Sequence, residues 1–287
     1  MFIKFGEFAK LVRIEHALML AVAVIIGEII VLGAFPPLGL VFLLSLIVPA
    51  LSEMGSFALN DYVDVEADRI NKRAGRPLVD GTLSPDFALK FSAGAFIIST
   101  MAALAINWMA LVVAIVFNVL AVLYNLKLKD LPLIGNMYIG ATMAIPFIFG
   151  AVVFGIEPTM TIWVIAAMGF AAGLAREIIK TVEDMEGDAL ARKSRTLPMV
   201  VGRANALAMA SSLLFAFVPL SMVPFIGGLT LSTVSGILLG LADLGIFWIA
   251  IYIILSKDDK VLGNARKYSL LWLFVGLLAL LAASLGY

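Results

Sequence analysis

Residues 38–77 read LGLVFLLSLIVPALSEMGSFALNDYVDVEADRINKRAGRP, an apolar run followed at once by a strongly charged one. The first part, about 38–59, matches the roughly 20 apolar residues that cross a bilayer as a helix. The second part carries its acidic residues first and most of its basic residues after them. This change predicts a membrane-spanning helix that ends at a polar surface.

The whole chain has the composition of a membrane protein. Of its 287 residues 62% are hydrophobic and only 14% are charged, whereas soluble domains carry about 25% charged residues. Transmembrane β-strands are shorter and alternate in polarity, so we expect an all-α integral membrane protein. No polar stretch is long enough for a soluble domain, and residues 1–287 are expected to form a single transmembrane domain. The chain has no Cys and one His, which excludes disulfides and thiolate sites and argues against a His-rich metal site.

Nine apolar windows of spanning length predict nine transmembrane helices around a central cavity. They cover approximately 14–34, 38–59, 87–106, 109–126, 133–154, 159–179, 205–225, 230–255 and 268–286. The turn between the third and fourth spans is marked only by Asn107 and Trp108. Two polar connections are longer than a turn requires, about 60–86 and 180–204.

The basic residues lie on one side of this topology. With nine spans, all 20 Lys and Arg fall on the side of the amino-terminal segment and of every second connection, in these segments or in the adjoining ends of the spans. Cytoplasmic segments are enriched in Lys and Arg. We therefore expect a multi-pass protein of the cell membrane whose amino terminus and two polar loops are cytoplasmic.

Acidic residues recur at helical spacing in both polar connections. If the second span continues as a helix, Asn60, Asp64 and Asp68 form a stack with Asp61 beside them, and like charges at that spacing repel unless something positive is held between them. After the sixth span, Asp184 and Asp188 repeat the pattern. Clustered carboxylates without His or Cys suit Mg²⁺, which is usually bound together with substrate phosphates. The alternative is a pair of solvated loops whose acids balance the cytoplasmic cations.

At these residues the sequence resembles the UbiA superfamily of intramembrane prenyltransferases. The two motifs that carry the resemblance are Asn60-Asp61-x-x-Asp64-x-x-x-Asp68 and Asp184-x-x-x-Asp188, after the second and sixth of nine spans. The resemblance implies that Asn60 and the aspartates bind a prenyl diphosphate through Mg²⁺, with Asp61 as a supporting ligand. It further implies that the isoprenoid tail occupies an apolar tunnel open to lipid.

Other polar residues near the motifs are candidates for substrate binding. For the phosphates these are the cations Lys72, Arg73, Arg76, Lys180, Arg192 and Lys193, which could instead act only as topology signals. Arg13 is a further candidate for substrate binding. Tyr124 and Asn125, at the end of the fourth span, could contact a carbocation or serve as an interfacial anchor. Glu53, seven residues before Asn60, could orient or deprotonate an acceptor, or be protonated and hydrogen-bonded. Glu28 and Asp243 are expected to be structural.

The acceptor is expected to be a lipid that carries a phosphate. Three runs resemble archaeal members of the family that join a geranylgeranyl group from its diphosphate to the hydroxyl of geranylgeranylglyceryl phosphate: Arg176-Glu177-x-x-Lys180-x-x-Glu183-Asp184-x-x-Gly187-Asp188, Asn71-Lys72-x-x-x-Arg76-Pro77 and Tyr124-Asn125-x-Lys127-x-Lys129. The alternative acceptor is aromatic, of the 4-hydroxybenzoate, quinone or chlorophyll type. The alternative from another class is a secondary transporter, which predicts broken helices near the midplane. No nucleic-acid partner is expected.

Overall fold

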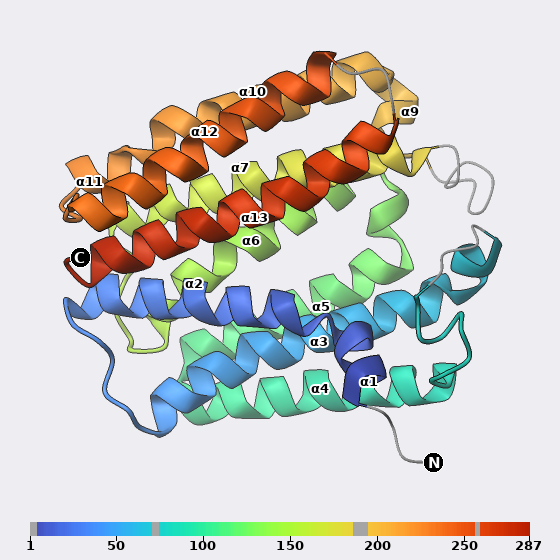
Figure 1. Ribbon diagram of the computed structural model, residues 1–287. Helices are drawn as coiled ribbons and strands as arrows, with labels where there is room; N and C mark the ends of the chain where they lie inside the picture. Colours follow the sequence, from blue (N-terminus) through green and yellow to red (C-terminus); the bar gives the residue numbers. More distant parts are fainter. Residues whose placement is uncertain (1–4, 71–74, 186–194, 256–258) are drawn as a thin grey trace.

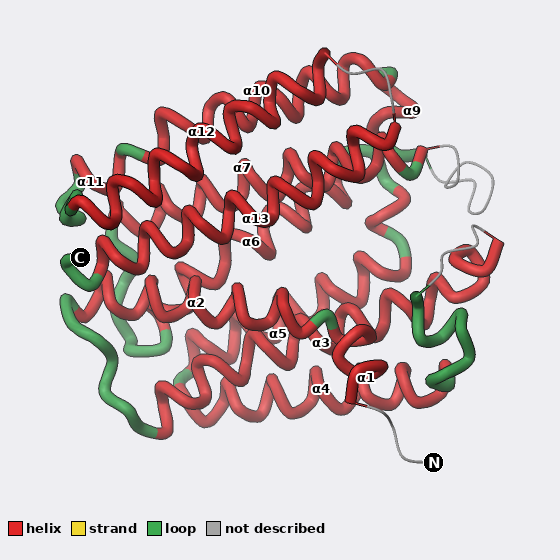
Figure 2. The backbone as a smooth tube through the Cα atoms, viewed as in Figure 1, coloured by secondary structure: helices red, strands yellow, loops and turns green. Residues whose placement is uncertain are grey.

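The computed structural model describes residues 5–70, 75–185, 195–255 and 259–287. Within these ranges every regular element is a helix and no strand is present. The helices run roughly alongside one another in a bundle, and most loop segments lie at its two ends (Figures 1 and 2). In chain order they are α1 (Phe5–Val12), α2 (Ile14–Leu32), α3 (Leu40–Ile70), α4 (Pro85–Ile106), α5 (Trp108–Leu126), η1 (Leu128–Asp130), α6 (Ile134–Val152), α7 (Met160–Glu183), α9 (Leu197–Val201), α10 (Arg203–Ser221), α11 (Val223–Ile226), α12 (Thr233–Leu255) and α13 (Asp259–Ser284).

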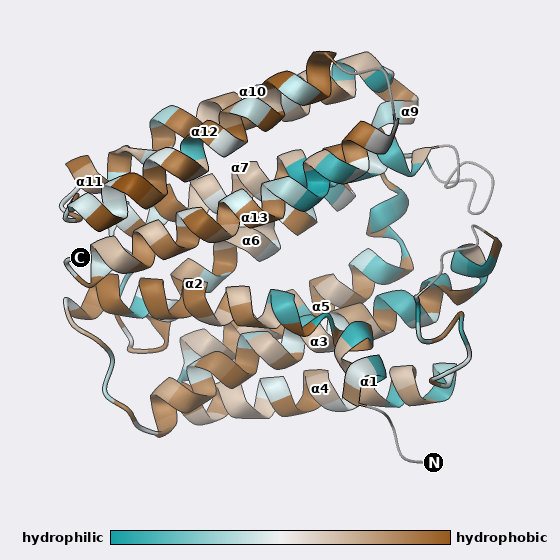
Figure 3. Ribbon diagram, in the orientation of Figure 1, coloured by the Kyte–Doolittle hydropathy of each residue, from teal (hydrophilic) through white to brown (hydrophobic). Residues whose placement is uncertain are grey.

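The described residues contain nine helical segments that are long and apolar enough to cross a membrane. They coincide with the nine predicted spans, so the prediction of an all-α, multi-pass membrane protein is confirmed. Large apolar side chains such as Trp108, Leu244 and Trp248 are exposed on the bundle, where they would face lipid. Hydrophilic residues gather toward the end of the bundle at which α3 and α7 finish (Figure 3).

The turn between α4 and α5 is built by Asn107. Its backbone is extended, and its side chain accepts a hydrogen bond of 2.9 Å from the backbone N–H of Ala110, which caps α5. The same amide donates to the carbonyls of Val152 and Val153 at 2.9 and 3.0 Å. One residue therefore ends a helix, starts the next and ties the turn to the end of α6.

Two helices are longer than the spans predicted from hydropathy. Helix α3 continues for 31 residues to Ile70, so the first acidic motif is helical and not part of a loop that begins at residue 60. Helix α13 begins at Asp259 and not near residue 268. The reason is that an apolar window detects only the part of a helix inside the hydrocarbon core, and a helix can continue into the polar region with charged residues on it.

Glycines bring three helices into backbone contact. A Cβ atom on Gly27 or Gly150 would overlap the backbone carbonyl of Phe147 or Val24 across the α2–α6 interface, and one on Gly169 would overlap a carbonyl of α6 from α7. Small residues at such positions allow close approach of helices in a membrane. The helices α2, α6 and α7 thus form a tightly packed layer beside which the cavities described below lie.

Candidate active site

Two adjoining cavities open at the hydrophilic end of the bundle. The polar chamber has a volume of about 560 Å³ and is lined by the acidic face of α3 together with Arg76, Lys129 and Asp184. The apolar chamber has a volume of about 430 Å³ and runs between the helices toward Phe147 and Leu280. The residues that line both chambers lie at their junction: Arg13, His16, Asn60, Tyr124, Glu177, Lys180 and Arg266.

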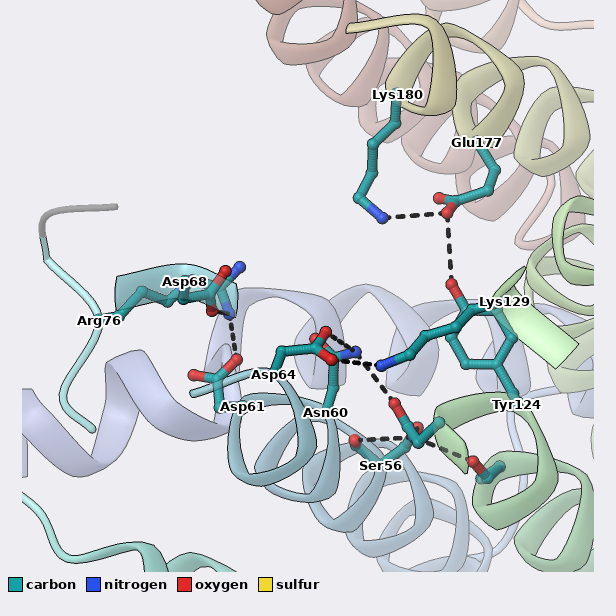
Figure 4. A network of polar contacts seen from close by, with 12 residues as sticks. Ser56, Asn60, Asp61, Asp64, Asp68, Arg76, Tyr124, Lys129, Glu177 and Lys180 are labelled. Atoms are coloured by element: carbon teal, nitrogen blue, oxygen red, sulfur yellow. Dashed lines mark hydrogen bonds and ion pairs between the residues drawn. The ribbon is translucent and has the colours of Figure 1, made fainter. Parts of the chain in front are cut away.

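The motif aspartates of α3 share one face of the helix, as their spacing in the sequence predicts. Asp61, Asp64 and Asp68 are buried and line the polar chamber. Asn60 donates a hydrogen bond of 3.1 Å to Asp64 and another of 3.0 Å to the amide oxygen of Asn125 on α5 (Figure 4). Since Asn125 also donates to the carbonyl of Ala121 at 2.9 Å, the motif is fixed to a second helix.

Basic side chains contact each of these carboxylates. Lys129 pairs with Asp64, and Arg76 pairs with Asp61 and lies 3.6 Å from Asp68 (Figure 4). The positive charge that the acidic stack requires is therefore supplied in part by the chain itself. A diphosphate entering this chamber would meet both carboxylates and cations.

Arg13 is the third cation beside this stack. Its NH2 group lies 3.3 Å from Asp61, and its guanidinium carbon lies 4.2 Å from the ring centroid of Phe57. The backbone of Arg13 is left-handed, with φ of 47°, a conformation that costs free energy for a non-glycine residue and is found mostly at functional sites. Burial lowers the pKa of Arg13 and the neighbouring Arg76 lowers it further, opposed by Asp61. An anion bound beside Arg13 would offset that burial.

The opposite wall of the junction comes from α5, α6 and α7. Tyr124 donates a hydrogen bond of 3.3 Å to Glu177, which also accepts one of 3.0 Å from Lys180 (Figure 4). The ring of Tyr124 stacks on Tyr138 with centroids 4.8 Å apart. Asp184 follows directly after α7 and lines the polar chamber. The aromatic pair is therefore tied to α7 through the hydrogen bond from Tyr124 to Glu177.

The structure gathers the predicted site residues that it describes around the two chambers. Those that line one or both are Arg13, Glu53, Asn60, Asp61, Asp64, Asp68, Arg76, Tyr124, Asn125, Lys180 and Asp184. Lys72, Arg73, Asp188, Arg192 and Lys193 lie outside the described residues. Glu28 and Asp243 line neither chamber; Glu28 is fully buried and Asp243 accepts a hydrogen bond of 2.7 Å from Ser221.

Several polar lining residues were not among the predicted ones, and they include Lys129, Glu177 and Arg266. Glu177 could have been found from the sequence, because it lies three residues before Lys180 and seven before Asp184, on one helical face. Lys129 follows the turn after α5, and Arg266 lies on the unpredicted first part of α13. Lys129 belongs to a run that carries the resemblance, but that run does not show that Lys129 reaches Asp64, and Arg266 has no local signal. Only the packing of helices places the two residues at the site.

Comparisons with known proteins agree with this arrangement. The profile of the UbiA prenyltransferase family matches residues 18–278. A protein of Methanopyrus kandleri named digeranylgeranylglyceryl phosphate synthase is 35% identical over 281 residues, which cover 97% of this chain and 99% of that protein.

Solved structures share the fold. One reported as "Structural and mechanistic insights into the biosynthesis of Digeranylgeranylglyceryl phosphate synthase in membranes" is 27% identical with a TM-score of 0.76, and the match covers 98% of this chain and 99% of that one. A UbiA homologue from Archaeoglobus fulgidus, solved bound to DMAPP and Mg²⁺, is 20% identical with a TM-score of 0.65 over 96% of this chain and 99% of that one. The resemblance inferred from the two motifs is confirmed: the chain belongs to the UbiA prenyltransferase family.

Proposed function

We propose that the protein transfers a geranylgeranyl group from geranylgeranyl diphosphate to the free hydroxyl of geranylgeranylglyceryl phosphate, forming an ether lipid. The observation that carries the proposal is the junction of the two chambers: a polar one lined by carboxylates and cations opens into an apolar one. That junction suits a substrate with a charged head and a long hydrocarbon tail. The choice of acceptor is supported by the relative from Methanopyrus kandleri, which is similar along nearly the whole chain.

The donor chemistry of the acids fits Mg²⁺. Asp61, Asp64, Asp68 and Asp184 offer carboxylate oxygens in one chamber, and the second motif adds Asp188. Within the described residues no three acidic or histidine side chains converge as a metal cage, but Mg²⁺ usually takes only one or two carboxylates and completes its shell with water and substrate phosphate. When bound there, Mg²⁺ would supply positive charge against the charge that develops on the departing diphosphate.

Cationic side chains share that role. Lys129, Arg76 and Arg13 already contact the aspartates, so their charges are fixed before a substrate arrives. Preorganised charges of this kind stabilise a transition state without a reorganisation cost. We include Lys72 and Lys193 in this proposal because they follow the first and the second acidic motif in the sequence.

The residues that line the junction can stabilise the allylic cation that forms when the donor loses its diphosphate. The C1–O bond of the donor breaks, its electron pair leaves with the diphosphate, and the acceptor oxygen bonds to C1 and gives up its proton to the released diphosphate. The stacked rings of Tyr124 and Tyr138 can face the transient cation, which aromatic faces attract. Asn125 holds Asn60 in place, and the apolar lining excludes water that would otherwise capture the cation.

The active-site end is proposed to face the cytoplasm. The described basic residues lie in the amino-terminal segment, in every second connection and on the adjoining turns of the helices, and the positive-inside rule favours the cytoplasmic side for such segments. We further propose that residues 1–287 act as one domain, since both chambers are lined by helices from α2 to α13.

The test is an assay of the purified protein with Mg²⁺ and radiolabelled geranylgeranyl diphosphate. We expect a labelled ether lipid with geranylgeranylglyceryl phosphate as acceptor and none with 4-hydroxybenzoate. In Asp64→Ala and Asp184→Ala turnover should be lost while the thermal unfolding profile remains cooperative. Product from 4-hydroxybenzoate alone would refute the proposed acceptor, and solute uptake into vesicles without any transfer would refute the enzyme assignment.

A further inference from the structure

Arg176 is a charge without a carboxylate partner inside a spanning helix. Its Nε donates to the hydroxyl of Ser269 at 3.0 Å and its NH2 to the carbonyl of Arg266 at 3.4 Å, both neutral oxygens. Among the residues that the structure describes, no carboxylate lies within ion-pair distance of Arg176. Charges within a membrane protein are costly unless paired, and they usually mark a substrate path. Arg176 therefore has the features of a residue that receives an anion from outside the chain.

Two further cations lie on the same wall. Lys180 is one helical turn beyond Arg176 and donates to Glu177 at 3.0 Å. Arg266, on α13, is 3.2 Å from Glu183. These contacts orient the two cations without neutralising Arg176, so the wall formed by α7 and α13 keeps an excess of positive charge at this point.

This cationic wall is distinct from the acidic face of α3. Asp61, Asp64, Asp68 and Asp184 line only the polar chamber, whereas Arg176 lines only the apolar one. Lys180 and Arg266 line both. An anion held by these three residues would lie at the entrance of the apolar chamber, on the far side of the junction from the α3 carboxylates.

We propose that Arg176, Lys180 and Arg266 form the subsite for the phosphate of the acceptor lipid; this inference rests on the function proposed above. A guanidinium matches the oxygens of a phosphate in a two-point contact. With its phosphate held on α7 and α13, the acceptor can keep its tail in the apolar chamber and present its hydroxyl toward the donor bound at α3.

The test compares two acceptors, geranylgeranylglyceryl phosphate and geranylgeranylglycerol, which lacks the phosphate. The wild-type protein should prefer the phosphorylated acceptor in kcat/KM. In Arg176→Gln that preference should fall by about tenfold to a hundredfold, as expected for the loss of a charged hydrogen bond, while the KM for geranylgeranyl diphosphate stays unchanged. Arg176→Lys should retain part of the preference, and Lys90→Gln, which removes an exposed cation outside both chambers, should retain all of it.

The outcomes separate the subsite from the function. If the wild-type protein transfers to the phosphorylated acceptor and Arg176→Gln keeps the full preference, the subsite is overturned and the function stands. If the wild-type protein transfers to neither acceptor, the proposed function itself fails and the subsite with it. Should Arg176→Gln not fold, Arg266→Gln provides the same comparison, and an undiminished preference in that variant overturns the subsite equally.

Discussion

The pair formed by Lys129 and Asp64 gives a prediction about stability that can be sized from the structure. Both side chains are nearly buried, with 9% and 10% of their surfaces exposed. Removal of one partner from a buried ion pair costs about 3–5 kcal/mol where the other charge loses all its compensation. Asp64 keeps the hydrogen bond from Asn60 and has further contacts, so we expect Lys129→Met to lower the free energy of unfolding by about 3 kcal/mol, the lower end of that range.

Thermal unfolding in detergent measures this effect. A loss of ~3 kcal/mol corresponds to a fall in Tm of roughly 6–12 °C for a large domain. The matched control is Lys90→Met, since Lys90 pairs with Asp86 at 2.8 Å while both side chains are more than two-thirds exposed; exposed pairs contribute only about 0.3–0.5 kcal/mol. Asp64→Asn added to Lys129→Met should recover most of the loss. Equal Tm values for the two lysine variants would refute the reasoning.

Three further predictions follow from the packing and the site. Gly150→Ala should lower the free energy of unfolding by about 1–3 kcal/mol through overpacking. The control is Gly94→Ala, which should be neutral or slightly stabilising in the same thermal assay because its added Cβ meets nothing within 4 Å. Glu53→Gln should keep its turnover in the transfer assay, since Gln can replace a Glu53 that only forms hydrogen bonds in the apolar chamber. A loss of about 100-fold or more would instead identify a general base. Mg²⁺ without diphosphate should raise the Tm of Lys129→Met more than that of the wild-type protein, since ligand binding stabilises by mass action and the metal no longer competes with Lys129 for Asp64. An equal shift in both would argue that Asp64 does not bind the metal.

The sequence predicted which residues share one helical face, but it did not predict which residues contact one another across helices. Asn60, Asp64 and Asp68 could be placed together because their spacing is that of one helical face. Their partner Lys129 could not, since it reaches Asp64 only through the packing of α5 against α3.

His16 shows the same difficulty. Its place at the start of the first span does not indicate a site residue, yet its ring packs against Phe57 with centroids 5.2 Å apart, and His16 lines both chambers. Arg266 was assigned to a connection because hydropathy does not detect a helix beyond the hydrocarbon core. In each case the sequence of one segment does not show which other helices pack beside it.

The length of α3 bears on how the products leave. At about 1.5 Å per residue its 31 residues extend over roughly 46 Å, against a hydrocarbon core of about 30 Å, so the turns that carry Asp64 and Asp68 stand at the level of the lipid headgroups. A bond cleaved at that depth leaves one product next to water and the other next to lipid. In the proposed reaction the freed diphosphate would be released next to water, and the prenylated lipid would be released next to the bilayer. Each product can therefore depart by its own exit, and neither has to cross a phase in which it is insoluble.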